Sequence, residues 1–532
     1  MICKNCQQLF EICSEDNEFY QKINVPIPTF CPSCRQQRRL AWRNERTLFQ
    51  RQCSATGKLI ISMYQAETPF PVYDHFYYFS DEWDPLTYGR EFDFSRPFFE
   101  QFHDLQMVVP RMKNYSISNE NAEYGNLSSW NKNCYMMFES DNNEDSLYSE
   151  YSFRCKDIVD TSYAKECEFC YECVDIMKCY NLWYSFNCKN CYDSYFLKNC
   201  TGCNNCFACI NLINKKYCFF NEELTQAEYE KKTQEINLNT VNGIFEIQMK
   251  FLDFTKRFPH PFMNGFQNEN CTGDNLNNSK NAHFCFNCSE INNSKYIYGS
   301  ERIKDSYDID TYGGAEGCQQ VYECQSVGRG SFNVAFGSNV YQNISDSQYC
   351  DICANSKNIF GCISLRNNEN CILNKQYSKH DFQDLRTKII DHMHKTGEWG
   401  EFFPIKYSPF PYNETMAQIY YPLTKDQAIQ KGYFWRDKDQ KEYQIQQDVQ
   451  VCIATGKVFR LQKAELEFYK KNNIPLPNKH PDVRYQERMT LRNPQKLWSR
   501  NCNKCAKKIM TSYAPDRVEI IYCKECYLKE IY

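Results

Sequence analysis

The sequence contains the same module twice, once at each end of the chain. Residues 1–64 match residues 450–513 without a gap, and every equivalent position is 449 residues apart. Shared features include a first cysteine (Cys3 and Cys452) and the aromatic pair Phe19-Tyr20, which recurs as Phe468-Tyr469. A chain of 532 residues is too long for one hydrophobic core. We therefore expect a multi-domain α+β protein in which duplicated modules bracket the interior.

Each copy keeps one four-cysteine set and has lost the other. The sets are Cys3, Cys6, Cys31 and Cys34 in the first copy, and Cys502, Cys505, Cys523 and Cys526 in the second. Two Cys-x2-Cys turns separated by 24 or 17 residues are typical of structural zinc sites. A helix is expected after the second turn of each set, as in a treble clef, and its positive end favours thiolate. The sequence predicts two structural Zn²⁺ ions in zinc-ribbon or treble-clef modules, with metal-free thiols as the alternative.

A row of arginines follows the Cys31–Cys34 turn on a helix that we expect to end near Leu48. The row comprises Arg35, Arg38, Arg39, Arg43 and Arg46, with Trp42 among them, and the second copy keeps Arg484, Arg488 and Arg492. Arginines beside an aromatic ring are able to hold phosphates and bases, so these nine residues are candidate nucleic-acid contacts. Pairing with nearby acids such as Glu45 and Glu487 is the alternative.

A second duplication fills the interior of the chain. Amphipathic helices are expected at 98–109 and 247–258, which are 149 residues apart and are each followed by proline. A stretch rich in Cys, Asn and Tyr follows each helix, and the two stretches end alike at Cys218 and Cys371. Polar helices are then expected near 225–236 and 378–394.

Cysteines in the first stretch recur every nine residues, as in Cys191, Cys200, Cys209 and Cys218. A short, sustained period is typical of a β-solenoid, here with roughly 18 residues per coil and like side chains stacked on successive coils. Asparagines also recur at nine, in Asn181, Asn190 and Asn199, and this residue tolerates left-handed turns.

An iron–sulfur or thiol redox site is the alternative for Cys200, Cys203, Cys206 and Cys209, whose spacing is similar to a ferredoxin run. The equivalent positions of the second stretch are Cys353, Ser356, Ile359 and Cys362. Only the nine-spaced cysteines persist there, which favours a structural ladder.

The composition limits the functional classes. The net charge is −4, so any nucleic-acid surface must be local. We found no apolar stretch long enough for a membrane helix and no signal peptide, so 33 cysteines indicate a reducing, cytoplasmic location. No catalytic constellation emerges from the spacing. We expect a non-enzymatic scaffold that binds nucleic acid or protein, without a membrane or a small-molecule substrate.

These patterns divide the chain into five predicted domains. Residues 1–80 and 450–532 are the zinc modules, 81–243 and 244–396 are the two helix–solenoid–helix units, and 397–449 is a Pro- and aromatic-rich connector.

Three loop segments and the two four-cysteine sets carry a family resemblance. The segments are Phe92–Phe99, Gly397–Pro404 and Tyr513–Arg517. On these residues the whole chain resembles uncharacterised large Cys-rich zinc-ribbon, treble-clef-like proteins of uncultured small-genome bacteria. The resemblance implies zinc binding and carries over no catalytic residue.

Overall fold

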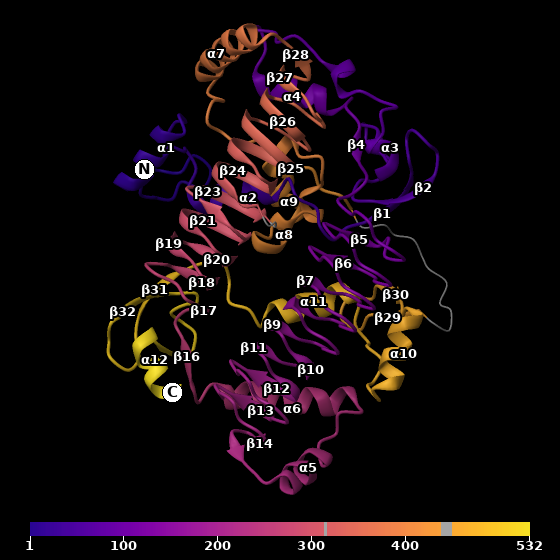
Figure 1. The fold of residues 1–532 in the computed structure, drawn as a ribbon, viewed down its shortest axis with the longest axis vertical. Helices are drawn as coiled ribbons and strands as arrows, with labels where there is room; N and C mark the ends of the chain where they lie inside the picture. Colours follow the sequence, from indigo (N-terminus) through magenta and orange to yellow (C-terminus); the bar gives the residue numbers. More distant parts are fainter. Residues whose placement is uncertain (313–315, 438–448, 532) are drawn as a thin grey trace. The chain divides into compact units, whose positions relative to one another are not determined.

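The computed structural model describes residues 1–312, 316–437 and 449–531. The chain forms two compact units, each built from two separate segments. Unit 1 comprises Met1–Asn114 and Met263–Asp437, and unit 2 comprises Tyr115–Phe262 and Lys438–Tyr532. Each unit therefore joins a terminal module to the solenoid that lies farther from it along the sequence (Figure 1). Within the described residues, no helix has the length and apolar character needed to cross a membrane.

Unit 2 contains the first solenoid, a coil of short strands that are parallel except for the last, Glu222–Glu223, which pairs antiparallel with the strand before it. Its strands are β5 (Gly125–Asn126), β6 (Met137–Phe138), β7 (Glu150–Phe153), β8 (Ser162–Lys165), β9 (Val174–Met177), β10 (Tyr180–Trp183), β11 (Phe186–Lys189), β12 (Tyr192–Lys198), β13 (Phe207–Ile210), β14 (Cys218–Phe219) and β15 (Glu222–Glu223). Glu150 pairs with Ser162, and Ser162 pairs with Val174. The coil therefore has 12 residues, and the predicted coil of roughly 18 residues is wrong.

The structural repeat within a coil is a tripeptide. One residue in three is left-handed, as in Asn181 (φ 48°), Tyr184 (φ 52°), Asn187 (φ 55°) and Asn190 (φ 53°). The residue after each corner points into the coil, and Leu182, Ser185, Cys188 and Cys191 are at most 2% exposed. Four corners thus close one 12-residue coil. Asn181, Asn190 and Asn199 all adopt the left-handed conformation, which asparagine tolerates.

The nine-residue cysteine period is a consequence of this geometry. Nine residues are three tripeptides, or three quarters of a 12-residue coil. Each nine-residue step therefore ends at an inward position one corner before a full turn is completed. The Cys191 thiol donates hydrogen bonds to the carbonyls of Lys189 and Cys200, both at 3.4 Å. Cysteine suits this position because it is small, largely apolar and able to donate to a backbone carbonyl.

Unit 1 contains the second solenoid, which is less regular. Its strands are β17 (Gly265–Phe266), β18 (Gly273–Asn277), β19 (Lys280–His283), β20 (Cys285–Ser289), β21 (Asn292–Ser300), β22 (Ile303–Lys304), β23 (Tyr307–Tyr312), β24 (Cys318–Arg329), β25 (Phe332–Gln348), β26 (Ala354–Phe360), β27 (Glu369–Ile372) and β28 (Lys375–Gln376). Leu276 pairs with Cys288 at the 12-residue offset, whereas Val321 pairs with Val334, one residue later. Single-residue insertions of this kind obscure the period in the sequence.

Helices pack against the solenoid of each unit. In unit 2, α5 (Gln226–Gln234) and α6 (Val241–Thr255) follow the solenoid, and Phe251 packs against Phe196 and Phe207. In unit 1, α4 (Phe98–Gln106) and α7 (Lys379–Thr396) share a core with Tyr349 and Phe360. Helix α4 therefore packs on the second solenoid, whereas the predicted domain 81–243 groups it with the first.

The terminal modules have the same elements at a constant offset. Helices α1 (Ser14–Lys22) and α2 (Pro32–Leu40) correspond to α10 (Lys463–Lys471) and α11 (Pro481–Met489). Strands β1 (Phe49–Gln52) and β2 (Leu59–Ser62) correspond to β31 (Trp498–Asn501) and β32 (Lys508–Thr511), and α3 (His75–Phe79) corresponds to α12 (Lys524–Ile531). The duplication thus continues beyond the 64 matched residues. Helix α2 ends at Leu40, earlier than the predicted Leu48.

The remaining elements of the described residues are short strands and helices. Strand β3 (Val72–Tyr73) pairs with β4 (Arg111–Met112) in unit 1, and β16 (Pro259–Pro261) pairs with β33 (Ile520–Tyr522) in unit 2. Strands β29 (Val449–Val451) and β30 (Val458–Arg460) form a hairpin, and the remaining helices are η1 (Pro85–Tyr88), η2 (Ile405–Tyr407), η3 (Tyr412–Glu414), α8 (Met416–Tyr420) and α9 (Lys425–Gln430). Residues 438–448 of the predicted connector lie outside the described residues.

Candidate metal centres

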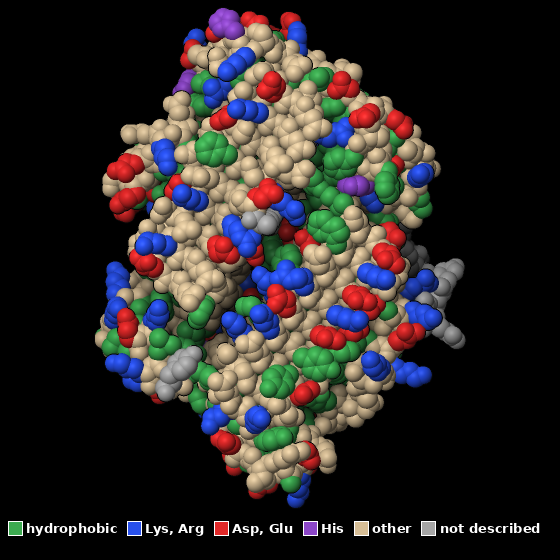
Figure 2. All heavy atoms as spheres, viewed as in Figure 1, with side chains coloured by type: hydrophobic (Ala, Val, Ile, Leu, Met, Phe, Trp, Pro, Cys, Tyr) green, Lys and Arg blue, Asp and Glu red, His purple; other side chains and the backbone are tan. Residues whose placement is uncertain are grey.

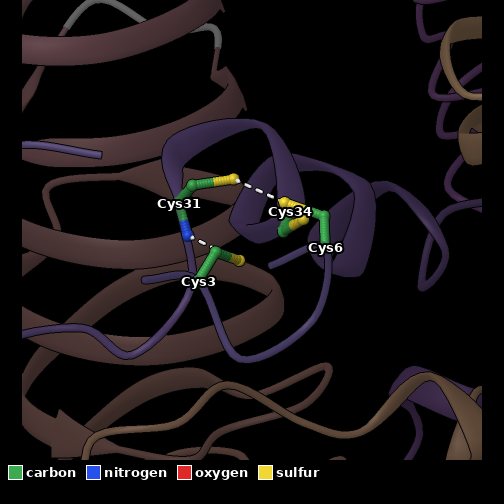
Figure 3. A group of neighbouring side chains, drawn as sticks. All are labelled: Cys3, Cys6, Cys31 and Cys34. Carbon is green, nitrogen blue, oxygen red and sulfur yellow. Dashed lines mark hydrogen bonds between the residues drawn. The ribbon is translucent and has the colours of Figure 1, made fainter. Parts of the chain in front are cut away.

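The first four-cysteine set converges in unit 1. The sulfur atoms of Cys3, Cys6, Cys31 and Cys34 lie within 4.8 Å of one another (Figure 3). The Sγ atoms of Cys6 and Cys31 are 3.7 Å apart. Four thiolates around a tetrahedral zinc, with Zn–S bonds of about 2.3 Å, have sulfurs about 3.8 Å apart. The spacing of the sulfurs is therefore compatible with one tetrahedral metal ion.

The second set has the same geometry in unit 2. Cys502, Cys505, Cys523 and Cys526 also lie within 4.8 Å of one another, and the Sγ atoms of Cys505 and Cys523 are 3.7 Å apart. The backbone N–H of Cys523 donates to Cys502 Sγ at 3.2 Å, as the N–H of Cys31 does to Cys3 Sγ at 3.2 Å. The structure thus brings together all eight predicted ligands as two groups that are able to hold a metal ion.

Hydrogen bonds favour ionisation of some of the sulfurs in each set. The Cys34 thiol donates to Cys31 and lowers the pKa of Cys31 to about 5. Burial opposes ionisation of Cys502, but the backbone N–H groups of Cys523, Cys505 and Lys504 lower its pKa to about 6. The hydrogen bond to Cys31 raises the pKa of Cys34, and burial raises the pKa of Cys523, so these contacts ionise only part of each set. A metal-binding cysteine must be deprotonated, and a bound ion would favour the thiolate form of the others.

The degenerate second set of the first module is closed by hydrogen bonds. Asp74 occupies the position of Cys523, and its carboxylate accepts from Cys53 Sγ at 3.3 Å and Thr56 Oγ1 at 3.1 Å. The Asp74 N–H donates to Cys53 Sγ at 3.2 Å, as the Cys523 N–H does to Cys502. The turn keeps its left-handed residue, Gly57 (φ 70°). Protein groups therefore hold this turn, whose counterpart in the other copy carries the complete four-cysteine set.

The degenerate first set of the second module keeps only part of its ligands. Cys452 is buried, and Thr455, His480 and Val483 occupy the other ligand positions. The ring of His480 packs edge-on against Phe459 at 5.8 Å. The side chain of His480 also accepts from the Asp482 N–H, so packing and hydrogen bonds hold this turn.

The predicted arginine row of unit 1 is buried in ion pairs with the second solenoid. Arg35 lies 2.8 Å from Asp308, and Arg39 lies 2.6 Å from Asp310. Arg38 pairs with Glu323 at 3.1 Å and with Glu401 at 2.6 Å. Arg39 is 0% exposed, and its carboxylate partners raise its pKa although burial opposes the charge.

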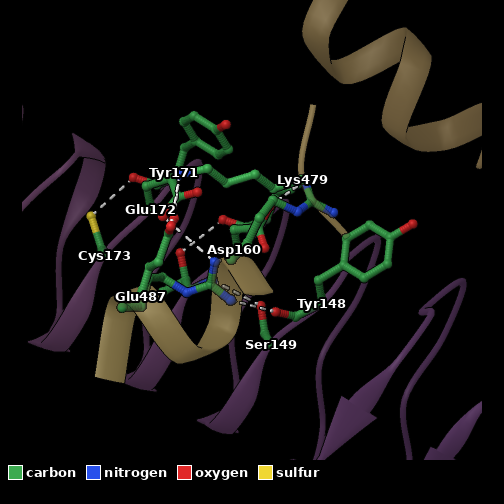
Figure 4. Close-up of polar contacts among 12 residues, drawn as sticks. Tyr148, Ser149, Asp160, Tyr171, Glu172, Cys173, Lys479 and Glu487 are labelled. Atoms are coloured by element: carbon green, nitrogen blue, oxygen red, sulfur yellow. Dashed lines mark hydrogen bonds and ion pairs between the residues drawn. The ribbon is translucent and has the colours of Figure 1, made fainter. Parts of the chain in front are cut away.

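Unit 2 repeats this arrangement with the first solenoid (Figure 4). Arg484 and Arg488 both lie 2.8 Å from Asp160, and Arg488 also pairs with Glu172 at 3.5 Å. Arg492 pairs with Asp175 at 2.8 Å. Asp160, Glu172 and Asp175 are left-handed corner residues of the solenoid, as are Asp308 and Glu323 in unit 1. We call these two sets of ion pairs the arginine interfaces.

The placement of these arginines is a correction to the nucleic-acid assignment. Arg35, Arg38, Arg39, Trp42, Arg43, Arg484 and Arg488 are at most 5% exposed. Arg43 is paired with Glu45, Arg492 is 11% exposed, and Arg46, which follows the helix, is partly buried. Guanidinium groups held by buried carboxylates have no face left for phosphate. Pairing with acids, the alternative interpretation, accounts for the row, although most of the partners come from the solenoids.

The four central cysteines line one coil of the first solenoid. Cys200, Cys203, Cys206 and Cys209 are all 0% exposed. Each thiol donates to backbone carbonyls, for example Cys203 to those of Thr201 and Leu212 at 3.6 and 3.3 Å. Across the described ranges, only the two terminal sets meet the geometric requirement for a metal ion. The central cysteines therefore serve as packing groups of the coil.

Sequence analysis missed the acidic side of both arginine interfaces. Other acids lie close to both in the sequence, Asp157 before Asp160 and Asp305 before Asp308, and nothing local marks Asp160 or Asp308 as buried. The signal that could have identified them is the three-residue repeat of the solenoid, which places both at left-handed corners.

No protein-family model matches the chain, and no curated protein matches it in sequence.

Proposed function

We propose that this chain is a non-enzymatic, zinc-binding scaffold for macromolecular interaction. The observation that carries the proposal is the pair of four-cysteine groups, each with sulfurs spaced for a tetrahedral ion. A closed set of four cysteines without an open coordination position is typical of a structural ion, not a catalytic one. The treble-clef arrangement of the duplicated modules belongs to the same proposal.

The position of the four-cysteine sets supports a role for the metal in assembling the fold. In each module a helix begins at the second ligand turn, α2 in the first module and α11 in the second. Helix α2 carries a cysteine ligand and α11 has lost it, and both helices present arginines to a solenoid. In unit 1 the same nine-residue helix contains the ligand Cys34 and the paired residues Arg35 and Arg39. An ion at this set would therefore hold both the module and one side of the arginine interface.

The solenoids supply the surface for a partner. On the first solenoid, Lys132 pairs with Glu120 and Lys156 pairs with Glu144, so one exposed row alternates in charge. On the second, an open hollow is lined by Asn343, Asn355, Asn367, Ser345, Lys357, Asn368, Ser356 and Glu369. Long polar rows of this kind suit binding to an extended macromolecule.

Elemental analysis tests the metal part of the proposal. The purified chain should contain two zinc ions and no iron, because each four-cysteine group takes one ion. Cys6→Ser and Cys505→Ser should each remove one zinc, whereas Cys200→Ser should remove none. Iron in the protein, or a zinc count that falls in the Cys200→Ser variant, would support the iron–sulfur or redox alternative instead.

A further inference from the structure

The two terminal modules differ greatly in charge although they share one fold. Residues 450–532 contain 17 lysines and arginines against 8 acidic residues, a net charge of +9. Residues 1–83 contain 9 of each, a net charge of zero. The chain as a whole has a net charge of −4, so the positive charge is concentrated in the C-terminal module. Because the fold does not require this charge, it points to a partner of the C-terminal module.

Five exposed lysines lie around the intact cysteine set of this module. They are Lys504, Lys507, Lys508, Lys524 and Lys529, and we call them the lysine surface. Lys504 pairs with Glu530 at 2.5 Å, and Lys507 pairs with Glu525 at 3.3 Å. These pairs join the Cys502–Cys505 turn to α12, so the lysines of the turn and of the helix belong to one surface.

The first module provides an internal comparison. The positions equivalent to Lys504, Lys507, Lys508, Lys524 and Lys529 are Ala55, Lys58, Leu59, His75 and Ser80. Four of the five lysines are therefore absent where the same turn and helix have lost their metal ligands. The lysines accompany the intact cysteine set, and the turn itself does not need them.

Neutralisation of the metal centre does not account for the lysine surface. A zinc ion with four thiolates carries a charge of about −2. The intact set of the first module has one lysine on its turns, Lys4, and a hydrogen bond from Asn5 to Cys34 Sγ at 3.2 Å. One lysine and one amide are therefore sufficient beside an equivalent cluster.

The lysine surface also faces solvent. The side chains of Lys504 and Lys507 are 45% and 60% exposed, and Lys508, Lys524 and Lys529 are exposed. In Figure 2, Lys and Arg side chains outnumber acidic ones over the part of unit 2 that contains β31, β32 and α12. The ammonium group of Lys504 lies 5.6 Å from the ring of Tyr522, which places an aromatic group within the same surface.

We propose that the lysine surface binds nucleic acid through its phosphodiester backbone. This inference rests on the proposed scaffold function and names one partner for it. Mobile, solvated lysines that surround a rigid metal-held turn contact phosphates without selecting bases. The arginine interfaces are occupied by carboxylates, so they take no part in this contact.

Binding of the full-length, zinc-loaded chain to a labelled 20-nucleotide single strand tests the proposal. The test variant is Lys504→Gln with Lys508→Gln and Lys524→Gln. The matched control is Lys232→Gln with Lys256→Gln and Lys425→Gln, which removes three charges from ion-paired surface lysines outside both the solenoid rows and the lysine surface. We expect the test variant to bind at least tenfold more weakly. Its plot of log affinity against log salt should be shallower by about 2 to 3, because each lost phosphate contact removes about 0.7 to 0.9.

Several results would overturn the proposal. One is equal binding by the test and control variants, and another is equal binding of poly-glutamate and the oligonucleotide by the wild-type chain. Absence of oligonucleotide binding at low salt would also overturn it. Zinc content is measured on the same samples. Two zinc ions without nucleic-acid binding would reject this inference and leave the scaffold proposal standing, whereas fewer than two would reject the proposed function itself.

Discussion

Arg39 illustrates how a single residue that looks like a ligand contact becomes part of the core. Its guanidinium lies 2.6 Å from Asp310 and 3.3 Å from Asp308, and all three side chains are at most 2% exposed. Burying these charges costs several kcal/mol per ion, which their mutual attraction and hydrogen bonds must offset. The same arrangement at Arg488 and Asp160 indicates that the module–solenoid contact depends on this chemistry in both units.

Replacing Arg39 by alanine should destabilise unit 1 by about 3 to 5 kcal/mol, because Asp310 would remain buried without its main partner and Asp308 would keep only Arg35. Denaturant unfolding of the variant measures this loss. The control is Arg96→Ala, since Arg96 pairs with Asp104 but is 43% exposed. An exposed pair contributes about 1 kcal/mol or less. Similar losses for the two variants would contradict the assignment of Arg39 to a buried interface.

His260 gives unit 2 a titrating group at the position where unit 1 has Arg111. His260 is 0% exposed, and burial and Lys198 lower its pKa to about 3, with Arg517 acting in the same direction and Glu519 opposing. Its ring lies 5.9 Å from that of Tyr513. The equivalent Arg111 is instead paired with Asp351 at 2.6 Å.

The stability of unit 2 should therefore fall as the pH drops below about 6.5. In that range His260 binds a proton in the unfolded chain but stays neutral in the folded chain. This stability is fully present above pH 6.5 and is lost as the pH falls towards about 3. Between pH 6.5 and 5 the loss amounts to about 2 kcal/mol. Unfolding curves at both pH values should show a smaller difference for His260→Leu than for wild type. His380→Gln should behave like wild type, because His380 is 82% exposed.

At the scale of elements, the solenoid corner is the unit that determines the fold. Asn281 is a corner residue (φ 50°), and its amide donates to the Asn293 side chain of the next coil at 3.0 Å. Asn270 donates in turn to Asn281 at 2.9 Å, so the amides form a ladder along the solenoid. Asparagine thus supplies both the left-handed conformation and a bond between coils.

Asn281→Gly and Asn281→Val separate these two contributions. Glycine keeps the left-handed corner and loses the ladder bonds, so we expect a loss of about 1 kcal/mol. Valine loses the bonds and is also forced into a left-handed conformation, which should add about 1 to 2 kcal/mol. Denaturant unfolding measures both variants. Equal losses would mean that the corner conformation at residue 281 imposes no cost on a β-branched residue.

The elements also show what could be predicted from the sequence. Expected helices at 98–109, 247–258 and 378–394 are present as α4, α6 and α7, with shifted ends. The solenoid was predicted from the nine-residue cysteine period, but its 12-residue coil was not. Inward positions are occupied by Cys, Ser, Ile or Leu, as Cys179, Leu182 and Ser185 show. The three-residue period is therefore not visible when the positions of one residue type alone are compared.

The candidate metal sites were predictable for a different reason. All eight ligands lie in local Cys-x2-Cys turns, and each pair of turns belongs to one module. The arginine interfaces join residues that are far apart in sequence, such as Arg35 and Asp308. Local patterns identified the arginines but carried no information on the solenoid acids that bind them.

At the scale of the whole chain, each compact unit contains one module, one solenoid and one complete cysteine set. The chain passes from the first module to the first solenoid, yet that module packs on the second solenoid through Arg35 and Asp308. Neither unit is complete until distant segments meet. Contacts between residues this far apart in sequence form slowly, so we expect folding to be slower than for a protein with local contacts.

Loss of one zinc site should therefore destabilise one unit selectively. Cys6→Ser removes a ligand of unit 1, and Cys505→Ser removes the equivalent ligand of unit 2. A structural zinc contributes directly to folding free energy, because the site does not exist in the unfolded chain. Calorimetry should show two thermal transitions, of which Cys6→Ser lowers one and Cys505→Ser lowers the other. Hydrogen exchange assigns each transition, since faster exchange should appear in residues 263–372 for Cys6→Ser and in residues 125–223 for Cys505→Ser. Faster exchange of the same residues in both variants would show that the two metal sites stabilise a single cooperative structure, in which case the division into two units would not describe how the protein unfolds.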